Sequence, residues 1–152
     1  MSVETNPANA YLRTKVLTAS PEELRLMLLD GAIKFARQGR EGLAVRDFEA
    51  SYNGISQSRD IVLELITSIK PEHDPELCER VKAVYTFMYS EMVAASMEKN
   101  IPKLDSVIKL LEYERETWSM LMDQLASERG GSTVAPNSPA QPESRAAISV
   151  EA

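Results

Sequence analysis

Apolar and polar residues alternate along this chain with the three-to-four-residue period of amphipathic helices. Short stretches rich in proline or polar residues separate the periodic segments. The pattern predicts a short helix over residues 9–17 and long helices over residues 21–44, 47–69, 75–99 and 102–127. No segment has the two-residue period of a strand, so the sequence predicts an all-α fold. Short connections make consecutive helices run antiparallel. We expect an antiparallel four-helix bundle with a short additional N-terminal helix.

The second predicted helix begins with the most specific local signal in the chain. Ser20 can cap the free backbone N–H groups, Pro21 suits the first helical position, and Glu23 is spaced to complete a capping box. From Leu24 to Phe35, apolar side chains then point in nearly every direction. One face of this helix is expected in the bundle core. The pattern leaves open whether another face forms a docking groove.

The later helices each carry an apolar stripe at helical spacing. The third has Phe48, Tyr52, Ile55, Val62, Ile66 and Ile69, interrupted by Arg59. The fourth has Leu77, Val81, Val84, Tyr85, Met88, Met92 and Ala95. The fifth has Leu104, Ile108, Leu111, Arg115, Trp118, Met122 and Leu125. The spacing in the fifth is typical of a coiled-coil seam and predicts that Trp118 is a core anchor.

Charge and cysteine content narrow the class of partner and the compartment. The net charge is −6, from 23 acidic and 17 basic residues, which disfavours binding to nucleic acid or to anionic lipid. The single cysteine, Cys78, excludes an intramolecular disulfide and fits a reducing cytosol. No apolar run approaches the ~20 residues of a membrane span, and no export signal begins the chain. We expect a cytoplasmic protein without direct membrane insertion, whose partner is a protein or a small molecule.

Composition also predicts the domain organisation. Residues 1–8 are polar and read as a flexible N-terminal tail, and residues 9–128 form the helical bundle domain. Residues 129–152 contain Gly-Gly, several prolines and serines, and no aromatic residue. Such a segment cannot bury enough apolar surface to offset its ordering entropy, so it is expected to be a disordered C-terminal tail.

The chain offers little that could carry catalysis. The only histidine, His73, lies in a loop between two prolines, and no Glu-x-x-His pair is present. Cys78 has neither a histidine on its own helix nor a second cysteine. The sequence therefore predicts no catalytic residue, no cofactor and no metal site, and the protein is not expected to be an enzyme.

Flexible apolar side chains are the remaining signal. Six internal methionines are present: Met27, Met88, Met92, Met97, Met120 and Met122. Unbranched thioethers fill irregular gaps in cores, and they also repack against varied partners at binding surfaces. The sequence does not decide whether these methionines fill the core or form a binding surface. Together with the apolar second helix, they favour a protein that binds amphipathic helices in a groove.

Several motifs resemble the flagellin-specific secretion chaperones, the FliS family. The capped segment from Ala19 to Ile33 is the most specific, and Asn9-Ala10-Tyr11 resembles the family's N-terminal segment. The last two helices match in order and spacing through Val84, Tyr85, Met88, Asn100, Leu104, Val107, Leu110, Leu111 and Trp118. The resemblance covers roughly residues 9–125. One departure is Leu29, where the family motif usually carries tyrosine.

The resemblance implies a cytosolic chaperone that binds the C-terminal segment of flagellin and prevents its premature polymerisation. It also implies delivery of the client to the cytoplasmic domain of the flagellar type III export gate. Client-binding candidates are Tyr11, Leu24, Leu28, Ile33, Tyr52, Ile55, Tyr85 and Met88. The alternative is a helical adaptor with a client other than flagellin.

Overall fold

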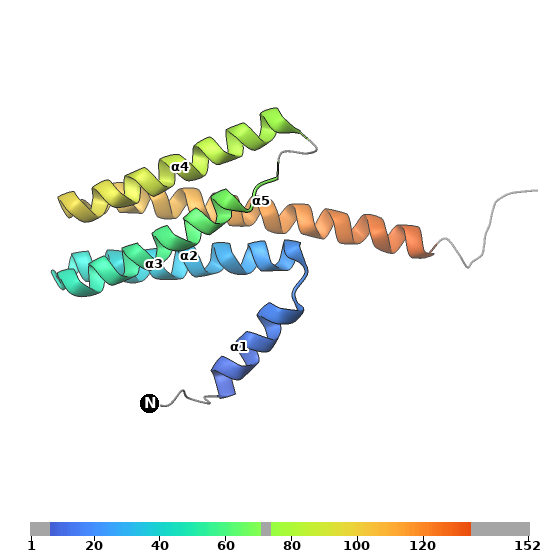
Figure 1. The fold of residues 1–152 in the computed structure, drawn as a ribbon, viewed down its shortest axis with the longest axis horizontal. Helices are drawn as coiled ribbons and strands as arrows, with labels where there is room; N and C mark the ends of the chain where they lie inside the picture. Colours follow the sequence, from blue (N-terminus) through green and yellow to red (C-terminus); the bar gives the residue numbers. More distant parts are fainter. Residues whose placement is uncertain (1–6, 71–73, 135–152) are drawn as a thin grey trace, which may run out of the picture. The chain divides into compact units, whose positions relative to one another are not determined.

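The computed structural model describes residues 7–70 and 74–134, with side chains as far as residue 129. All regular secondary structure in these residues is helical, which confirms the predicted all-α class. Figure 1 shows the helices in chain order: α1 (Pro7–Thr18), α2 (Pro21–Ala44), α3 (Phe48–Thr67), α4 (Pro75–Glu98) and α5 (Ile101–Val134). The chain divides into two compact units, residues 1–115 and residues 116–152, and α5 crosses the boundary.

The helices begin where polar side chains cap their free backbone groups. The Glu23 N–H donates to Ser20 Oγ over 3.1 Å, and the Ser20 N–H donates to the Glu23 carboxylate over 2.9 Å. This reciprocal pair is the predicted capping box, which satisfies two donors that the first turn of a helix leaves free. Asp47 caps α3 and Asp74 caps α4 through a single bond each, in which the side-chain oxygen accepts from the backbone N–H three residues further on.

Glycines allow α2 and α3 to pack closely along their length, and Figure 1 shows the two helices side by side. A Cβ atom at Gly42 would lie 2.5 Å from the backbone nitrogen of Ser51. Ser58 is fully buried at this contact, and its hydroxyl donates to the carbonyl of Ala32 over 2.7 Å. The glycines that weaken α2 by helix propensity therefore permit its tightest helix–helix contact.

The buried core of the first unit draws on four helices. It contains Leu29, Ala32, Ile33, Ala36 and Leu43 from α2, Ile55, Val62 and Leu65 from α3, Tyr85, Met88, Met92 and Ala95 from α4, and Leu104, Val107, Ile108 and Leu111 from α5. Leu29, where the resemblance led us to expect tyrosine, is fully buried. An apolar side chain at that position needs no hydrogen-bond partner in the core.

Ion pairs join α2 to the part of α5 within the first unit. Arg40 Nε lies 2.8 Å from Asp105 Oδ1, and Arg37 pairs with Glu112. As the residue number rises along α2 it falls along α5, so the two helices are antiparallel. The carboxylates are about 42% exposed, so these pairs contribute little stability and mainly favour one register.

The structure corrects three predictions. Helix α5 continues to Val134, beyond the predicted end at residue 127, because the nearest downstream proline is Pro136 and two glycines alone do not stop it. Trp118 is half-buried and does not belong to the buried core. Leu77 and Val84 are exposed, because they lie at the margin of the narrow face that α4 buries. The predictions for His73 and for the tail beyond residue 134 lie outside the described residues.

Candidate functional site

Helix α1 exposes all of its large apolar side chains. None of its residues is buried, and the exposed fraction reaches 68% at Tyr11 and 77% at Leu17. Leu12 and Val16 are exposed as well. These side chains leave apolar surface of α1 available for contact with a partner.

Helix α2 presents two apolar faces that differ in burial. Leu29, Ile33 and Ala36 are buried, whereas Leu24, Leu28 and Phe35 are half-buried. The face that the sequence could assign either to the core or to a groove therefore remains partly accessible at Leu24 and Leu28.

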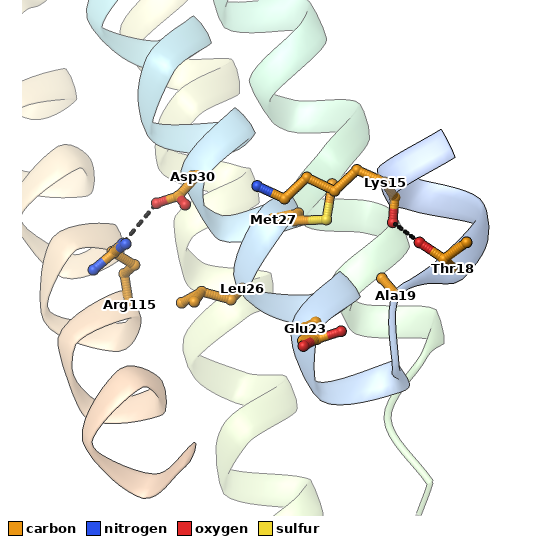
Figure 2. A pocket seen from close by; sticks show the side chains of 8 residues that line it. All are labelled: Lys15, Thr18, Ala19, Glu23, Leu26, Met27, Asp30 and Arg115. Atoms are coloured by element: carbon orange, nitrogen blue, oxygen red, sulfur yellow. Dashed lines mark hydrogen bonds and ion pairs between the residues drawn. The ribbon is translucent and has the colours of Figure 1, made fainter. Parts of the chain in front are cut away.

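A hollow of about 440 Å³ lies where α1 joins α2 (Figure 2). Its wall combines apolar and charged side chains: Lys15, Thr18, Ala19, Glu23, Leu26, Met27, Asp30 and Arg115. Arg115 Nε pairs with Asp30 Oδ1 at 2.6 Å, and Glu23 is engaged in the helix cap. Because both carboxylates already have partners, the hollow is better suited to an apolar side chain beside Leu26 and Met27 than to a cation.

Tyr85 joins three helices through its hydroxyl group. The ring is 1% exposed; its oxygen accepts from Arg25 Nη2 on α2 over 3.4 Å and donates to Glu114 on α5 over 3.3 Å. The Arg25 guanidinium also lies 5.6 Å from the ring centroid and donates to Ser68 Oγ over 3.2 Å. Burial raises the pKa of Tyr85, and the positive charge of Arg25 opposes this only in part. Tyr85 is therefore a neutral hydrogen-bonded link within the core.

The eight predicted client-binding residues lie at three depths. Two are exposed: Tyr11 and Tyr52. Two are half-buried: Leu24 and Leu28. Four are buried: Ile33, Ile55, Tyr85 and Met88. A partner that meets this arrangement of helices can touch the first two groups directly, whereas the four buried side chains belong to the core. Client binding by all eight stays a prediction.

Sequence reasoning missed one exposed aromatic residue on α4. Phe87 is 53% exposed, and Leu77 and Val84 on the same helix are also exposed. Phe87 lies outside the stripe formed by Tyr85, Met88 and Met92. The exposure of Phe87 could have been predicted from its position, because a large apolar residue outside the buried stripe of a helix faces solvent.

Cys78 is the described residue that the sequence analysis considered for thiol chemistry. Cys78 is half-buried near the start of α4, and its thiol donates to the carbonyl of Lys70 over 3.1 Å. In residues 7–70 and 74–134, no group of three or more His, Cys, Asp or Glu side chains could hold a metal ion. The same described residues contain no helix long and apolar enough to span a membrane.

Comparison with known proteins gives one consistent answer. Residues 4–125 match the family described as Flagellar protein FliS. The flagellar secretion chaperone FliS of Bacillus subtilis (strain 168) is 29% identical over 127 residues, which cover 84% of this chain and 94% of the relative. The FliS chaperone of Escherichia coli (strain K12) is 26% identical over 114 residues, covering 73% of this chain and 82% of the relative. The match spans the described helices from α1 to most of α5, and the chain belongs to the FliS family of flagellar proteins.

Proposed function

We propose that this chain is a flagellar secretion chaperone that binds the C-terminal segment of flagellin, one to one, before export. The observation that carries the proposal is the exposed apolar surface of α1, together with the half-buried face of α2, in a chain of the FliS family. The relatives named flagellar secretion chaperones support the chaperone role.

The physical basis is the coverage of an apolar stripe. A segment that forms amphipathic helices in a filament exposes apolar side chains when it is monomeric, and it then tends to self-associate. Docking of those side chains on the apolar residues of α1 and on Leu24 and Leu28 of α2 removes both surfaces from water. Premature polymerisation of flagellin is thereby prevented while the client waits for export.

The scaffold for this function is an antiparallel four-helix bundle of α2–α5, with α1 as an additional N-terminal helix. The antiparallel ion pairs between α2 and α5 and the close packing of α2 on α3 support this arrangement. The chaperone domain spans residues 9–128. The chaperone acts in the cytoplasm and delivers its client to the cytoplasmic domain of the flagellar type III export gate. It needs no cofactor and catalyses no reaction.

A polymerisation assay tests the proposal. Monomeric flagellin of the same organism is induced to polymerise with and without an equimolar amount of the full chain, and filament growth is followed by light scattering. We expect suppression at equimolar ratio. The control is flagellin that lacks its C-terminal segment, which should not co-elute with the chaperone in gel filtration. Unchanged filament growth, with no co-elution of intact flagellin, would favour an adaptor for another client.

A further inference from the structure

One face of α3 combines exposed apolar side chains with unsatisfied polar atoms. Tyr52, Ser56, Arg59 and Leu63 recur at the three-to-four-residue spacing that places them on one side of the helix. We call these four residues the α3 stripe. Tyr52 is 57% exposed and Leu63 is 46% exposed. Between them, Ser56 Oγ and Arg59 Nε are buried without a hydrogen-bond partner in the described chain.

The Arg59 guanidinium lies beside α4. Its Cζ atom is 5.7 Å from the centroid of the Tyr89 ring, so the stripe borders the seam between α3 and α4. In the described part of the chain, no carboxylate lies within ion-pair distance of Arg59, whereas Arg37 and Arg40 each pair with one. A guanidinium presents its N–H donors in a rigid fork that matches a carboxylate. The centre of the stripe is therefore complementary to a carboxylate.

We propose that the α3 stripe binds an amphipathic helix of the client that carries an Asp or Glu between two apolar contacts, and that Arg59 selects this carboxylate. Tyr52 and Leu63 are separated by about 16 Å at 1.5 Å per residue, which a client helix of about three turns covers. The apolar side chains of that helix pack on Tyr52 and Leu63, and its carboxylate accepts hydrogen bonds from the terminal Nη groups of Arg59, because the Nε atom itself is buried. This inference rests on the proposed function, because the client is the flagellin segment.

Charge also argues against a second copy of this chain as the occupant. In a two-fold symmetric dimer through the stripe, each Arg59 would approach the other, and two like charges would meet in a partly buried interface. The client helix brings the opposite charge. The stripe is thus assigned to a client helix that carries a carboxylate.

The experiment measures binding of the C-terminal flagellin peptide from the same organism to the full chain by calorimetry. Arg59→Gln removes the charge, and Arg80→Gln is the matched control, because Arg80 is an exposed α4 cation that pairs with Glu76 within its own helix. In a second arm, each carboxylate of the peptide is changed in turn to its amide, which leaves the chaperone unaltered.

We expect Arg59→Gln to weaken binding about tenfold or more, the loss typical of a hydrogen bond to a charged group, and Arg80→Gln to change it less than about twofold. One amide-substituted peptide should lose affinity for the wild-type chain and show no further loss with Arg59→Gln. Added salt should weaken wild-type binding more than it weakens Arg59→Gln binding.

Three results would overturn the inference. The first is that wild type and Arg59→Gln bind the peptide with equal affinity and that no amide substitution in the peptide weakens binding. Arg59 would then play no part in recognising the client, and the proposed function would still stand. The second is that sedimentation shows a dimer of the wild-type chain that Arg59→Gln abolishes. The α3 stripe would then bind a second copy of this chain and not a client helix. Absence of any peptide binding by the wild-type chain refutes both the proposed function and this inference.

Discussion

Gly39 on α2 and Gly54 on α3 face each other so closely that a Cβ atom at Gly54 would lie 2.5 Å from the backbone nitrogen of Gly39. The obstructing atoms belong to the backbone of α2, which cannot turn aside as a flexible side chain can. The contact between these two helices therefore depends on glycine at position 54.

Replacement of Gly54 by alanine should lower stability. Alanine gains about 1 kcal/mol in helix propensity, but the overpacked contact costs about 1–3 kcal/mol or more, and the backbone obstruction favours the upper part of that range. We expect a net loss of about 2 kcal/mol in the free energy of unfolding, measured by urea denaturation.

Gly31→Ala is the matched control for this substitution. Among the described residues, its Cβ atom would meet only the end of the Ile61 side chain, at 3.2 Å, and that methyl group can shift. The free energy of unfolding should stay within about 1 kcal/mol of the wild type. Equal losses for the two variants would mean that α2 and α3 do not pack through Gly54.

The buried phenol of Tyr85 should make stability depend on alkaline pH. Burial raises its pKa in the folded chain above the ordinary value of 10.0, so the unfolded chain releases this proton first as pH rises. The contribution is complete below the unfolded pKa and is lost as pH rises through the folded pKa. Urea melts from about pH 9 to pH 11 should show a steeper loss for the wild type than for Tyr85→Phe. Identical slopes would show that Tyr85 does not ionise differently on folding.

Replacement by alanine should lower the free energy of unfolding by different amounts at two positions on α5. Leu111 is fully buried, so Leu111→Ala should cost about 2–5 kcal/mol in the free energy of unfolding. Trp118 is half-buried, and Trp118→Ala should cost less than Leu111→Ala, although tryptophan is the larger residue. Denaturant melts of both variants decide the point. A larger loss of stability for Trp118→Ala than for Leu111→Ala would mean that Trp118 is a core residue, as the sequence predicts.

The apolar residues of α1 should affect binding but not stability. Because Leu12 and Leu17 are exposed, their joint replacement by serine should change the free energy of unfolding by no more than about 0.5 kcal/mol per site. If the client buries them, affinity for the flagellin peptide should fall about tenfold or more. Val45→Ser, which alters an exposed apolar residue outside α1, is the control and should leave affinity unchanged. Unchanged binding by the double variant would exclude α1 from the docking surface.

Helix starts were predictable from sequence because their signals are local. Ser20 and Glu23 form the capping box within four residues, and the caps at Asp47 and Asp74 use residues three positions further on. The end of α5 was not predictable to the residue, because glycine weakens a helix without stopping it.

Contacts between helices were harder to predict from the sequence, because they join residues that lie far apart in the chain. Gly39 and Gly42 appear only as weak points of α2 until Gly54 and Ser51 are seen opposite them. Tyr52 and Tyr85 are similar in sequence terms, yet one is exposed and the other is buried between Arg25 and Glu114.

The decisive experiment for client binding is isothermal titration of the full chain with the C-terminal segment of flagellin from the same organism. We expect one-to-one binding, a strongly negative heat-capacity change from burial of apolar surface, and only modest weakening by salt. No heat at several temperatures, together with no competition between the peptide and intact flagellin at micromolar concentrations, would contradict this expectation.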